Sequence, residues 1–371
     1  MNIGVPKEIK DNEKRISLTP SGAKELTTLG HNVFIETMAG IGSGFTDNSY
    51  LSAGATILQS ANDIFSKCEF IIKVKEPQTN EISMLNERHT MFTFFHFAAD
   101  ETLTNNFIKS KATAIAYETV QNNDGSLPIL IPMSEVAGRM SVQNGAKCLE
   151  ENMGGKGKLL GGVPGVKPAN ITILGAGIVG TNAAKLAAGL GGNVHILDVN
   201  MDRLRYLDDV MPKNVNTLYS NKHNINAILK KTDLLIGAVL IVGRKAPKLI
   251  SKDMLKNMSP GSVIVDVAVD QGGCVETCKP TTHKKPTYNV DSIVHYCVSN
   301  MPGSVPYTST LALTNITLPY IVNIAENGIK EAFRIDKTLL KGLNIYNGCI
   351  THEGVSNSFG YEYHNPDKFF S

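Results

Sequence analysis

The chain has 371 residues, of which 42% are hydrophobic and 19% charged, a composition typical of a globular protein with room for two cores. Its net charge of +2 argues against a nucleic-acid partner and against an anionic membrane surface. The longest apolar run, residues 234–243, is too short to span a bilayer, and Lys7 and Glu8 stand where a signal peptide needs apolar residues. Six cysteines spread over this length do not suggest a disulfide framework, so we expect a reduced, cytoplasmic protein.

Short apolar runs rich in β-branched residues alternate with helical stretches in the first third of the chain. Thr19, Pro20 and Gly30 predict one helix, since they supply a cap, a first-turn proline and a terminating glycine. Further helices are expected near residues 60–66, 79–87 and 101–110. Strands are expected at residues 2–6, 32–36, 70–75, 91–97 and 113–120. This alternation predicts a parallel sheet with helices on both faces.

A helical pattern with Ser134 as its expected N-cap leads into a glycine-dense stretch at residues 154–165. This stretch is no phosphate-binding P-loop, because Leu159 follows Gly157 and Lys158 where Ser or Thr would be needed. It is either a flexible connection or a mobile lid, and the sequence favours neither.

A second alternating series follows and again predicts a parallel sheet, with strands at residues 170–177, 193–198, 233–239, 262–270 and 294–300. From residue 308 the pattern becomes helical, with Pro319 as an expected kink or break. We therefore expect an α/β protein of two doubly wound units with a cleft between them and C-terminal helices returning to the first unit. Cys274, Cys278 and His283 lack a second ligand pair at a usual spacing, so no metal is expected.

The segment NITILGAGIVG places Gly175, Gly177 and Gly180 in G-x-G-x-x-G order between an expected strand and an expected helix. In a dinucleotide-binding Rossmann unit, the first glycine allows a tight turn and the second lets the pyrophosphate approach the helix N-terminus, while the third packs helix against strand. Asp198 ends the next strand, and its carboxylate can accept the ribose hydroxyls and repel a 2′-phosphate, which favours NAD over NADP. Arg203 could serve a phosphate, but beside Asp198 it is interpreted as a helix-surface cation or as a group stacked on adenine.

The segment TMFTFFHFAAD places His96 among four phenylalanines. A histidine in an apolar run is usually a core residue with a satisfied hydrogen bond. Open parallel sheets bind ligands beyond the carboxyl ends of their strands, however, and Arg15, Lys75, Asp270 and Asn300 also follow expected strands. Each of them alone could be a solvated loop charge or a turn residue. Together they predict a site at the mouth of a cleft between the units, where the two cations bind the carboxylate of an amino acid or 2-oxo acid.

With these residues in place, the sequence resembles the NAD-dependent alanine dehydrogenases, whose superfamily also includes the NAD-binding part of proton-translocating transhydrogenase. The resemblance runs along the whole chain and is carried by the segments GVPKEIKDNEKRISLTP, KVKEP, PMSEVAGRMS, GGKGKLLGGVPGV, LGAGIVG, VDVAVDQGGCVET, HYCVSNMPGSVP and YNGCITHEGV. It implies a substrate domain of residues 1–130 and 305–371, an NAD-binding domain of residues 131–304, and a homohexamer.

The resemblance also implies the reversible oxidative deamination of L-alanine to pyruvate and ammonia, with hydride transfer from the substrate Cα to NAD. His96 and Asp270 are then acid/base residues, and Arg15, Lys75 and Asn300 bind the substrate. The residues expected to contact NAD, beyond the three glycines, are Ser134, Ile178, Val179, Asp198, Arg203, Ser220, Val239, Leu240, Val267, Val298 and Met301. The positions that depart from the family pattern are Val242, Arg244 and Tyr307.

Two alternatives to this function stay open. A transhydrogenase subunit or a dehydrogenase of another amino acid shares much of the pattern, although the segment CITHEGV favours the alanine enzyme. A non-catalytic NAD-responsive protein belongs to a different class, and the joint presence of Lys75, His96 and Asp270 argues against it.

Overall fold

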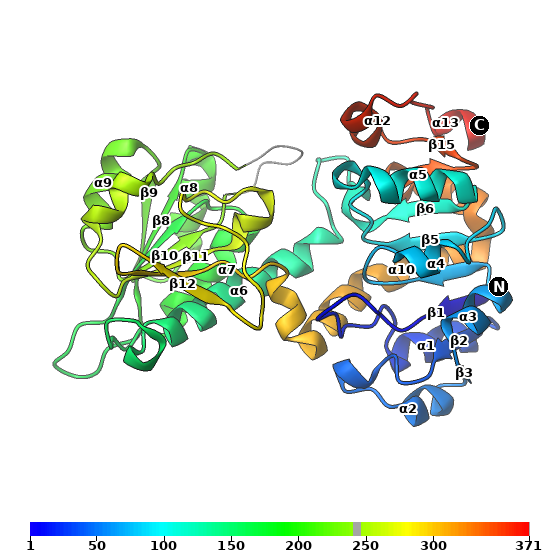
Figure 1. The fold of residues 1–371 in the computed structure, drawn as a ribbon, viewed down its shortest axis with the longest axis horizontal. Coiled ribbons are helices and arrows are strands. Elements are labelled where there is room, and N and C mark those ends of the chain that lie inside the picture. The colour runs from blue at the N-terminus through cyan, green and yellow to red at the C-terminus, as the bar shows by residue number, and fades with distance from the viewer. Residues whose placement is uncertain (240–245, 371) are drawn as a thin grey trace. The chain divides into compact units, whose positions relative to one another are not determined.

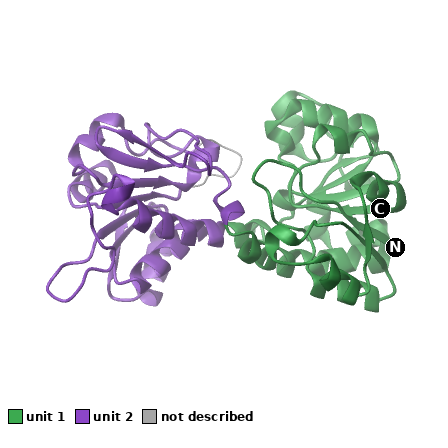
Figure 2. Ribbon diagram, turned by 60° about the horizontal axis from the view of Figure 1, so that its bottom comes forward, with its two compact units in different colours: residues 1–133, 305–371 green, residues 134–304 purple. Residues whose placement is uncertain are grey.

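The computed structural model describes residues 1–239 and 246–370 and divides the chain into two compact units. Unit 1 consists of residues 1–133 and 305–371, and unit 2 of residues 134–304 (Figure 2). Both chain termini lie in unit 1, which confirms the predicted return of the C-terminal helices to the first unit. Within the described ranges, no helix combines the length and the apolar character needed to cross a membrane.

Unit 1 is built on an eight-stranded sheet with the order β15-β14-β6-β5-β4-β1-β2-β3 (Figure 1). Strands β1 to β6 pair in parallel, as predicted, and β14 and β15 add an antiparallel edge. The strands are β1 (Asn2–Val5), β2 (Asn32–Glu36), β3 (Thr56–Leu58), β4 (Phe70–Ile72), β5 (Thr90–Thr93), β6 (Thr113–Ala116), β14 (Leu343–Tyr346) and β15 (Cys349–Ile350). Of these, β3, β14 and β15 were not predicted.

The helices of unit 1 begin where the sequence supplies caps. The hydroxyl of Thr19 accepts the N–H of Gly22 at the start of α1, and Pro20 occupies the first turn, as predicted. The carboxylate of Asp100 caps α5 in the same way by accepting the N–H of Leu103. The helices are α1 (Pro20–Thr28), α2 (Asp47–Ser52), α3 (Ala61–Lys67), α4 (Thr79–Ile82), α5 (Glu101–Ser110), α10 (Pro306–Ile335), α11 (Lys337–Lys341), α12 (Glu353–Phe359) and α13 (Asp367–Phe370).

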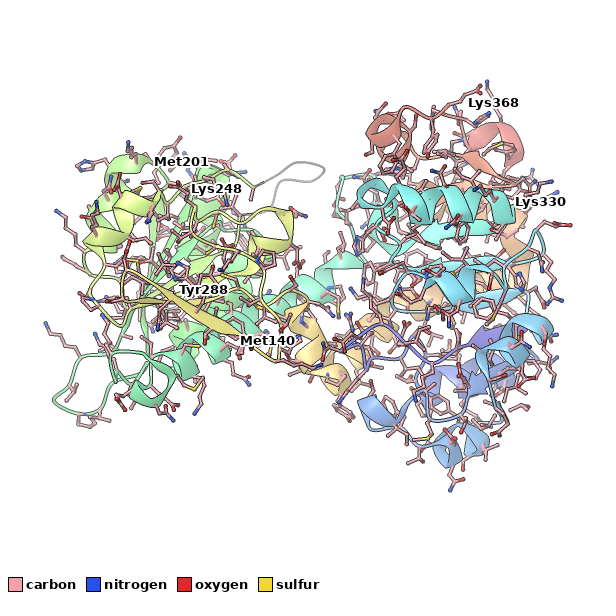
Figure 3. The ribbon with its side chains drawn as sticks, in the orientation of Figure 1. Met140, Met201, Lys248, Tyr288, Lys330 and Lys368 are labelled. Carbon is pink, nitrogen blue, oxygen red and sulfur yellow. The ribbon has the colours of Figure 1, made fainter. Side chains whose placement is uncertain are left out.

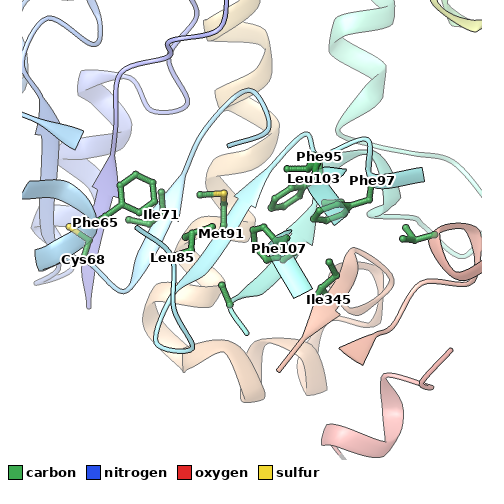
Figure 4. Packing of buried hydrophobic residues seen from close by; sticks show 14 of the residues in the cluster. Phe65, Cys68, Ile71, Leu85, Met91, Phe95, Phe97, Leu103, Phe107 and Ile345 are labelled. Atoms are coloured by element: carbon green, nitrogen blue, oxygen red, sulfur yellow. The ribbon is translucent and has the colours of Figure 1, made fainter. Parts of the chain in front are cut away.

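The core of unit 1 joins distant parts of the sequence (Figure 4). The rings of Phe95 and Phe97 stack with centroids 4.4 Å apart, and Phe107 of α5 packs edge-on against Phe95 at 5.1 Å. Met91 of β5 and Ile345 of β14 belong to the same cluster. The phenylalanines around His96 are therefore core residues, and the returning C-terminal segment shares that core.

Unit 2 contains a seven-stranded sheet with the order β12-β13-β11-β10-β7-β8-β9, parallel except for β12. Its strands are β7 (Asn170–Leu174), β8 (Asn193–Asp198), β9 (Val215–Tyr219), β10 (Leu234–Gly237), β11 (Val263–Asp266), β12 (Thr287–Val290) and β13 (Ile293–Tyr296). Helices α7 (Ile178–Gly189), α8 (Met201–Val210) and α9 (Lys222–Leu229) connect the strands that surround the glycine motif. Strands β9 and β12 were not predicted, and the remaining strands confirm the second parallel series.

Three helix predictions are wrong in detail. Helix α4 ends at Ile82, well before the predicted end at residue 87. Ser134 is not an N-cap, because α6 (Leu130–Cys148) already begins four residues earlier and places Pro132 in its first turn, where a missing N–H costs little. Helix α10 continues through Pro319, and its backbone departs from helical angles at Gly328 instead. The φ of Gly328 is 71°, a conformation that glycine adopts at little cost.

Most of the predicted strands end earlier than expected, and three of these ends, at Ile72, Thr93 and Asp266, share one cause. In each case a carboxylate accepts backbone N–H groups just beyond the strand: Glu8 for β4, Glu118 for β5 and Asp266 itself for β11. An N–H group bonded to a side chain cannot continue the ladder, so the chain turns away there. These three turns carry Lys75, His96 and Asp270.

Candidate active site

The loop after β1 presents a buried arginine. Arg15 is only 3% exposed, and its guanidinium binds Glu13 through two hydrogen bonds, Nε to Oε1 at 2.7 Å and Nη2 to Oε2 at 2.6 Å. Its Nη1 also lies 3.1 Å from the sulfur of Met133. Burial opposes ionisation of Glu13, but the hydrogen bonds and charge of Arg15 outweigh it and hold the pKa of Glu13 below its usual value. Arg15 is therefore fixed in place and is not a solvated loop cation.

Lys75 follows β4 and is partly buried beside Arg15. Burial, reinforced by the charge of Arg15, lowers the pKa of Lys75, and the nearby Glu13 offsets this only in part. Its backbone is held on both sides, because its N–H donates to Glu8 Oε1 at 3.2 Å and its carbonyl accepts the hydroxyl of Thr93 at 3.0 Å. Two cations thus lie in one region of unit 1, as the sequence predicted.

Beneath Lys75 lies a buried ion cluster that the sequence analysis missed. The ammonium of Lys73 contacts Glu8 at 3.0 Å and Glu81 at 2.9 Å, and the side chains of all three residues are at most 4% exposed. Glu8 also accepts the N–H of Val74 at 2.6 Å, so the cluster ties the loop after β1 to the end of β4. The signal available in the sequence was the pair of lysines in KVK, of which only Lys75 was considered.

His96 stands outside the aromatic core. Its imidazole is 51% exposed, whereas Phe94, Phe95 and Phe97 are at most 5% exposed, which excludes the alternative of a core histidine. The backbone at His96 is left-handed, with φ 56°, and this turn directs the side chain away from the path of β5. The ring of Phe94 lies parallel to the imidazole, with the centroids 6.0 Å apart.

In unit 2, each glycine of the G-x-G-x-x-G motif meets a different steric demand. Gly175 has φ 99°, and a Cβ on it would stand 2.7 Å from the carbonyl oxygen of Ala238. Gly177 caps the N-terminus of α7, and a Cβ there would meet no atom within 4 Å. At Gly180 a Cβ would lie 1.8 Å from the carbonyl oxygen of Gly175, so only glycine lets α7 approach the turn.

Asp198 and Arg203 are both joined to this glycine turn. The carboxylate of Asp198, at the end of β8, accepts the N–H of Ala176 at 2.6 Å. Arg203 donates from Nε to the carbonyl of Ala176 at 2.8 Å and from Nη2 to the hydroxyl of Thr181 at 2.8 Å. Arg203 is therefore not a free helix-surface cation, because both ends of its guanidinium hold the turn.

Met201, which begins α8 just after β8, is 45% exposed at the surface of unit 2 (Figure 3).

Asp270 and Asn300 lie together in unit 2. Asp270 is exposed within a 3-10 turn that follows β11, and it is not at the end of a strand as predicted. Asn300 adopts a left-handed conformation with φ 55° after β13, and its N–H points to Asp270 Oδ2 at 3.5 Å. Asp266 caps this turn by accepting the N–H of Ala268.

The other residues expected at the nucleotide lie in helices α6 and α7 or just after the strands of unit 2. Ser134 is inside α6, Ile178 and Val179 begin α7, and Ser220 follows β9, while Val239, Val267, Val298 and Met301 follow β10, β11 and β13. Leu240, Val242 and Arg244 fall outside the described residues. Tyr307, in the first turn of α10, is 57% exposed and packs against Phe45 with centroids 5.9 Å apart.

Comparison with known proteins identifies the family. The pattern described as "Alanine dehydrogenase/PNT, N-terminal domain" matches residues 4–137, and its C-terminal counterpart matches residues 141–353. An alanine dehydrogenase of Methanococcus maripaludis is 54% identical over 369 residues, which are 99% of this chain and 99% of the relative. The chain belongs to the alanine dehydrogenase/PNT family.

Solved structures of this family agree with the two-unit α/β fold. One described as L-alanine dehydrogenase has a TM-score of 0.95 and 52% identity, covering 97% of this chain and 99% of that chain. A transhydrogenase of Sinorhizobium meliloti has a TM-score of 0.80 at 24% identity, covering 95% and 99%, and shares the fold alone. The resemblance drawn from the sequence is thereby confirmed.

Proposed function

We propose that the chain catalyses the reversible, NAD-dependent oxidative deamination of L-alanine to pyruvate and ammonia. The observation that carries the proposal is the 54% identity, along nearly the whole of both chains, to a relative named alanine dehydrogenase. Unit 1 serves as the substrate domain and unit 2 as the NAD-binding domain.

The residues of unit 2 fit a dinucleotide. The open space at Gly177 lets a pyrophosphate reach the N-terminus of α7, where the N–H groups of Ile178 and Val179 are available. The carboxylate of Asp198 ends β8 beside this turn, where it can accept the ribose hydroxyls and repel a 2′-phosphate. When bound, NAD supplies the hydride acceptor.

The residues of unit 1 fit a small anion. Arg15 keeps its planar fork fixed by Glu13, and Lys75 brings a second cation into the same region. Together they bind the carboxylate and, in the reverse direction, the keto oxygen of pyruvate. Their burial strengthens each charge-assisted hydrogen bond, because little water competes.

Proton transfer falls to His96 and Asp270. His96 accepts the ammonium proton of L-alanine, because loss of hydride from Cα requires the neutral amine. Water adds to the imine that results, and collapse of the carbinolamine releases ammonia and leaves pyruvate. Asp270 orients the nitrogen or the attacking water, and Asn300 beside it binds the substrate.

One assay tests this function. NADH formation is followed by absorbance with L-alanine, L-lysine, glycine or no amino acid, and then with NADP in place of NAD. We expect turnover with L-alanine and NAD well above every other combination. Faster turnover with another amino acid would show that L-alanine is not the substrate. Nucleotide binding without turnover of any amino acid would favour a transhydrogenase subunit or an NAD-responsive protein.

We further propose a cytoplasmic homohexamer, an assembly that rests on the family resemblance alone. All six cysteines are free, which suits a reducing compartment. Light scattering of the purified protein measures the assembly, and a mass other than six chains would reject it.

A further inference from the structure

Glu118 joins the end of β6 to the turn that carries His96. It lies in a short 3-10 turn, residues Tyr117–Thr119, directly after β6, and its side chain is 15% exposed. Its carboxylate accepts the N–H of Phe95 at 3.2 Å and the N–H of His96 at 2.5 Å. Two consecutive backbone donors therefore converge on one side chain from the neighbouring strand.

This convergence explains the unusual backbone of His96. A left-handed conformation is costly for residues other than glycine and persists only where the surroundings impose it. The buried rings of Phe95 and Phe97 hold the chain from the core side. Glu118 holds it from the other side, and Tyr117 adds an edge-on contact with Phe94 at 5.1 Å.

The same carboxylate also faces the imidazole. Nδ1 of His96 lies 3.9 Å from Oε1 of Glu118, too far for a hydrogen bond and close enough for attraction between charges. Catalytic hydrogen bonds are often long in free enzymes and shorten when substrate binds. A proton held on Nδ1 by Glu118 would leave Nε2 as the nitrogen that exchanges protons with the substrate.

We propose that Glu118 is the positioning residue of His96, holding its backbone in the left-handed turn and accepting the Nδ1 proton so that Nε2 does the proton transfer. This inference rests on the proposed acid/base role of His96. Glu118 itself contacts no substrate and acts through the imidazole alone.

Two imidazoles face this carboxylate from different elements. His96 faces it from the turn after β5, and His352 faces it electrostatically from the start of α12, where Glu353 lies next along the chain. Burial lowers the pKa of His352, which keeps that imidazole neutral, while the charges of Glu118 and Glu353 oppose this. The geometry distinguishes the two imidazoles, because Glu118 also accepts the backbone N–H of His96 and its Oε1 lies 3.9 Å from Nδ1 of that ring.

The test compares Glu118→Gln and Glu118→Asp with Glu353→Gln, a matched control that removes an exposed carboxylate close to His352. For each variant, kcat and KM for L-alanine and NAD are measured across pH, together with Tm. In Glu118→Gln, kcat should fall at least about tenfold, by analogy with the loss of a histidine's orienting carboxylate. KM for NAD should stay unchanged.

Glu118→Asp should recover part of kcat, since a carboxylate remains to accept the N–H groups of Phe95 and His96. If Glu118→Gln is too unstable to assay, the test rests on Glu118→Asp. Its kcat should be at least about fivefold below that of the wild type, because the shorter side chain moves the carboxylate away from both N–H groups. A kcat equal to that of the wild type in the assayed Glu118 variant, or a loss of kcat no larger than in Glu353→Gln, would overturn the role of Glu118 and leave the proposed function standing. An inactive wild type would overturn the proposed function and this inference with it.

Discussion

Replacement of Lys73 by Met tests the buried ion cluster beneath the substrate cations. Lys73 Nζ lies 3.0 Å from Glu8 and 2.9 Å from Glu81, and the three side chains are 0%, 4% and 1% exposed. Met keeps most of the length of the lysine stem and removes only the ammonium. The variant therefore leaves two carboxylates buried with no cation between them.

The expected cost is large because both partners stay buried. Removal of one member of a buried ion pair typically destabilises a protein by about 3–5 kcal/mol. For a unit of this size, that corresponds to a fall in Tm of about 6–20 °C. Activity should fall as well, since Glu8 accepts the N–H groups of Val74 and Lys75 and so fixes the backbone at the substrate cation.

The cost should depend on pH in a definite direction. Burial raises the pKa of Glu8 in the folded protein, although Lys73 opposes this, and without Lys73 the pKa rises further. A carboxyl with a raised folded-state pKa favours folding at low pH and loses that stability as pH rises through its folded-state pKa. The deficit of the variant should thus be greatest near pH 7 and shrink towards about pH 5.

Far-UV circular dichroism measures this stability in urea and on heating, because the chain has no tryptophan for fluorescence. The control is Lys337→Met, which breaks the exposed pair with Asp367, whose side chains are 58% and 64% exposed, and should cost less than about 1 kcal/mol. Equal Tm values for the two variants, or a deficit that stays constant between pH 5 and 7, would refute the account of the cluster.

Three further changes address the chemistry. His96→Ala should lower kcat about 10²–10⁴-fold. Its Tm should stay nearly unchanged, since the imidazole is 51% exposed. A fall in Tm with an unchanged kcat would instead show that His96 is a structural residue. Asp198→Ser should raise the ratio of kcat/KM for NADP to that for NAD, and an unchanged ratio would contradict the ribose assignment. Lys75→Met should lower kcat/KM for L-alanine at least about tenfold, because a charged hydrogen bond contributes about 1.5–3 kcal/mol. Pyruvate is then titrated into the NADH complex of Lys75→Met and followed by NADH fluorescence. An affinity for pyruvate equal to that of the wild type would count against carboxylate binding by Lys75.

The architecture could be predicted from the sequence because its signals are local. The alternation of apolar runs and helical stretches fixes the two parallel sheets, and the glycine motif fixes the turn at Gly175 through sterics that act within a few residues. The edge strands β3 and β15 were missed, and their two or three residues are not extended by a longer apolar run of the kind that surrounds β5. Pro319 was a misleading local signal, because the helix tolerates it and breaks at a glycine.

The partners of the functional residues could not be predicted in the same way. Glu13 lies two residues from Arg15 and could have been found as a neighbour, but Glu118 is 22 residues from His96 and meets it only through the pairing of β5 with β6. The strand ends were misplaced for the same reason. Apolar residues continue past Thr93, and the turn depends on a carboxylate from another strand. Contacts of this kind follow from the fold and have no signature in a single segment.

The charges of unit 1 argue for an anionic ligand beside Lys75. Arg15 is matched by Glu13 through two hydrogen bonds, and Lys73 is shared by Glu8 and Glu81. Lys75 differs from both, because burial and the charge of Arg15 lower its pKa and the nearby carboxylates do not restore it. A ligand carboxylate placed there would stabilise the ammonium and raise the pKa of Lys75, whereas a neutral or cationic ligand would leave the penalty in place. Under the proposed function, the carboxylate of pyruvate or L-alanine therefore supplies the negative charge that offsets the burial of Lys75. This is why charge removal at Lys75 should affect the substrate and spare the dinucleotide.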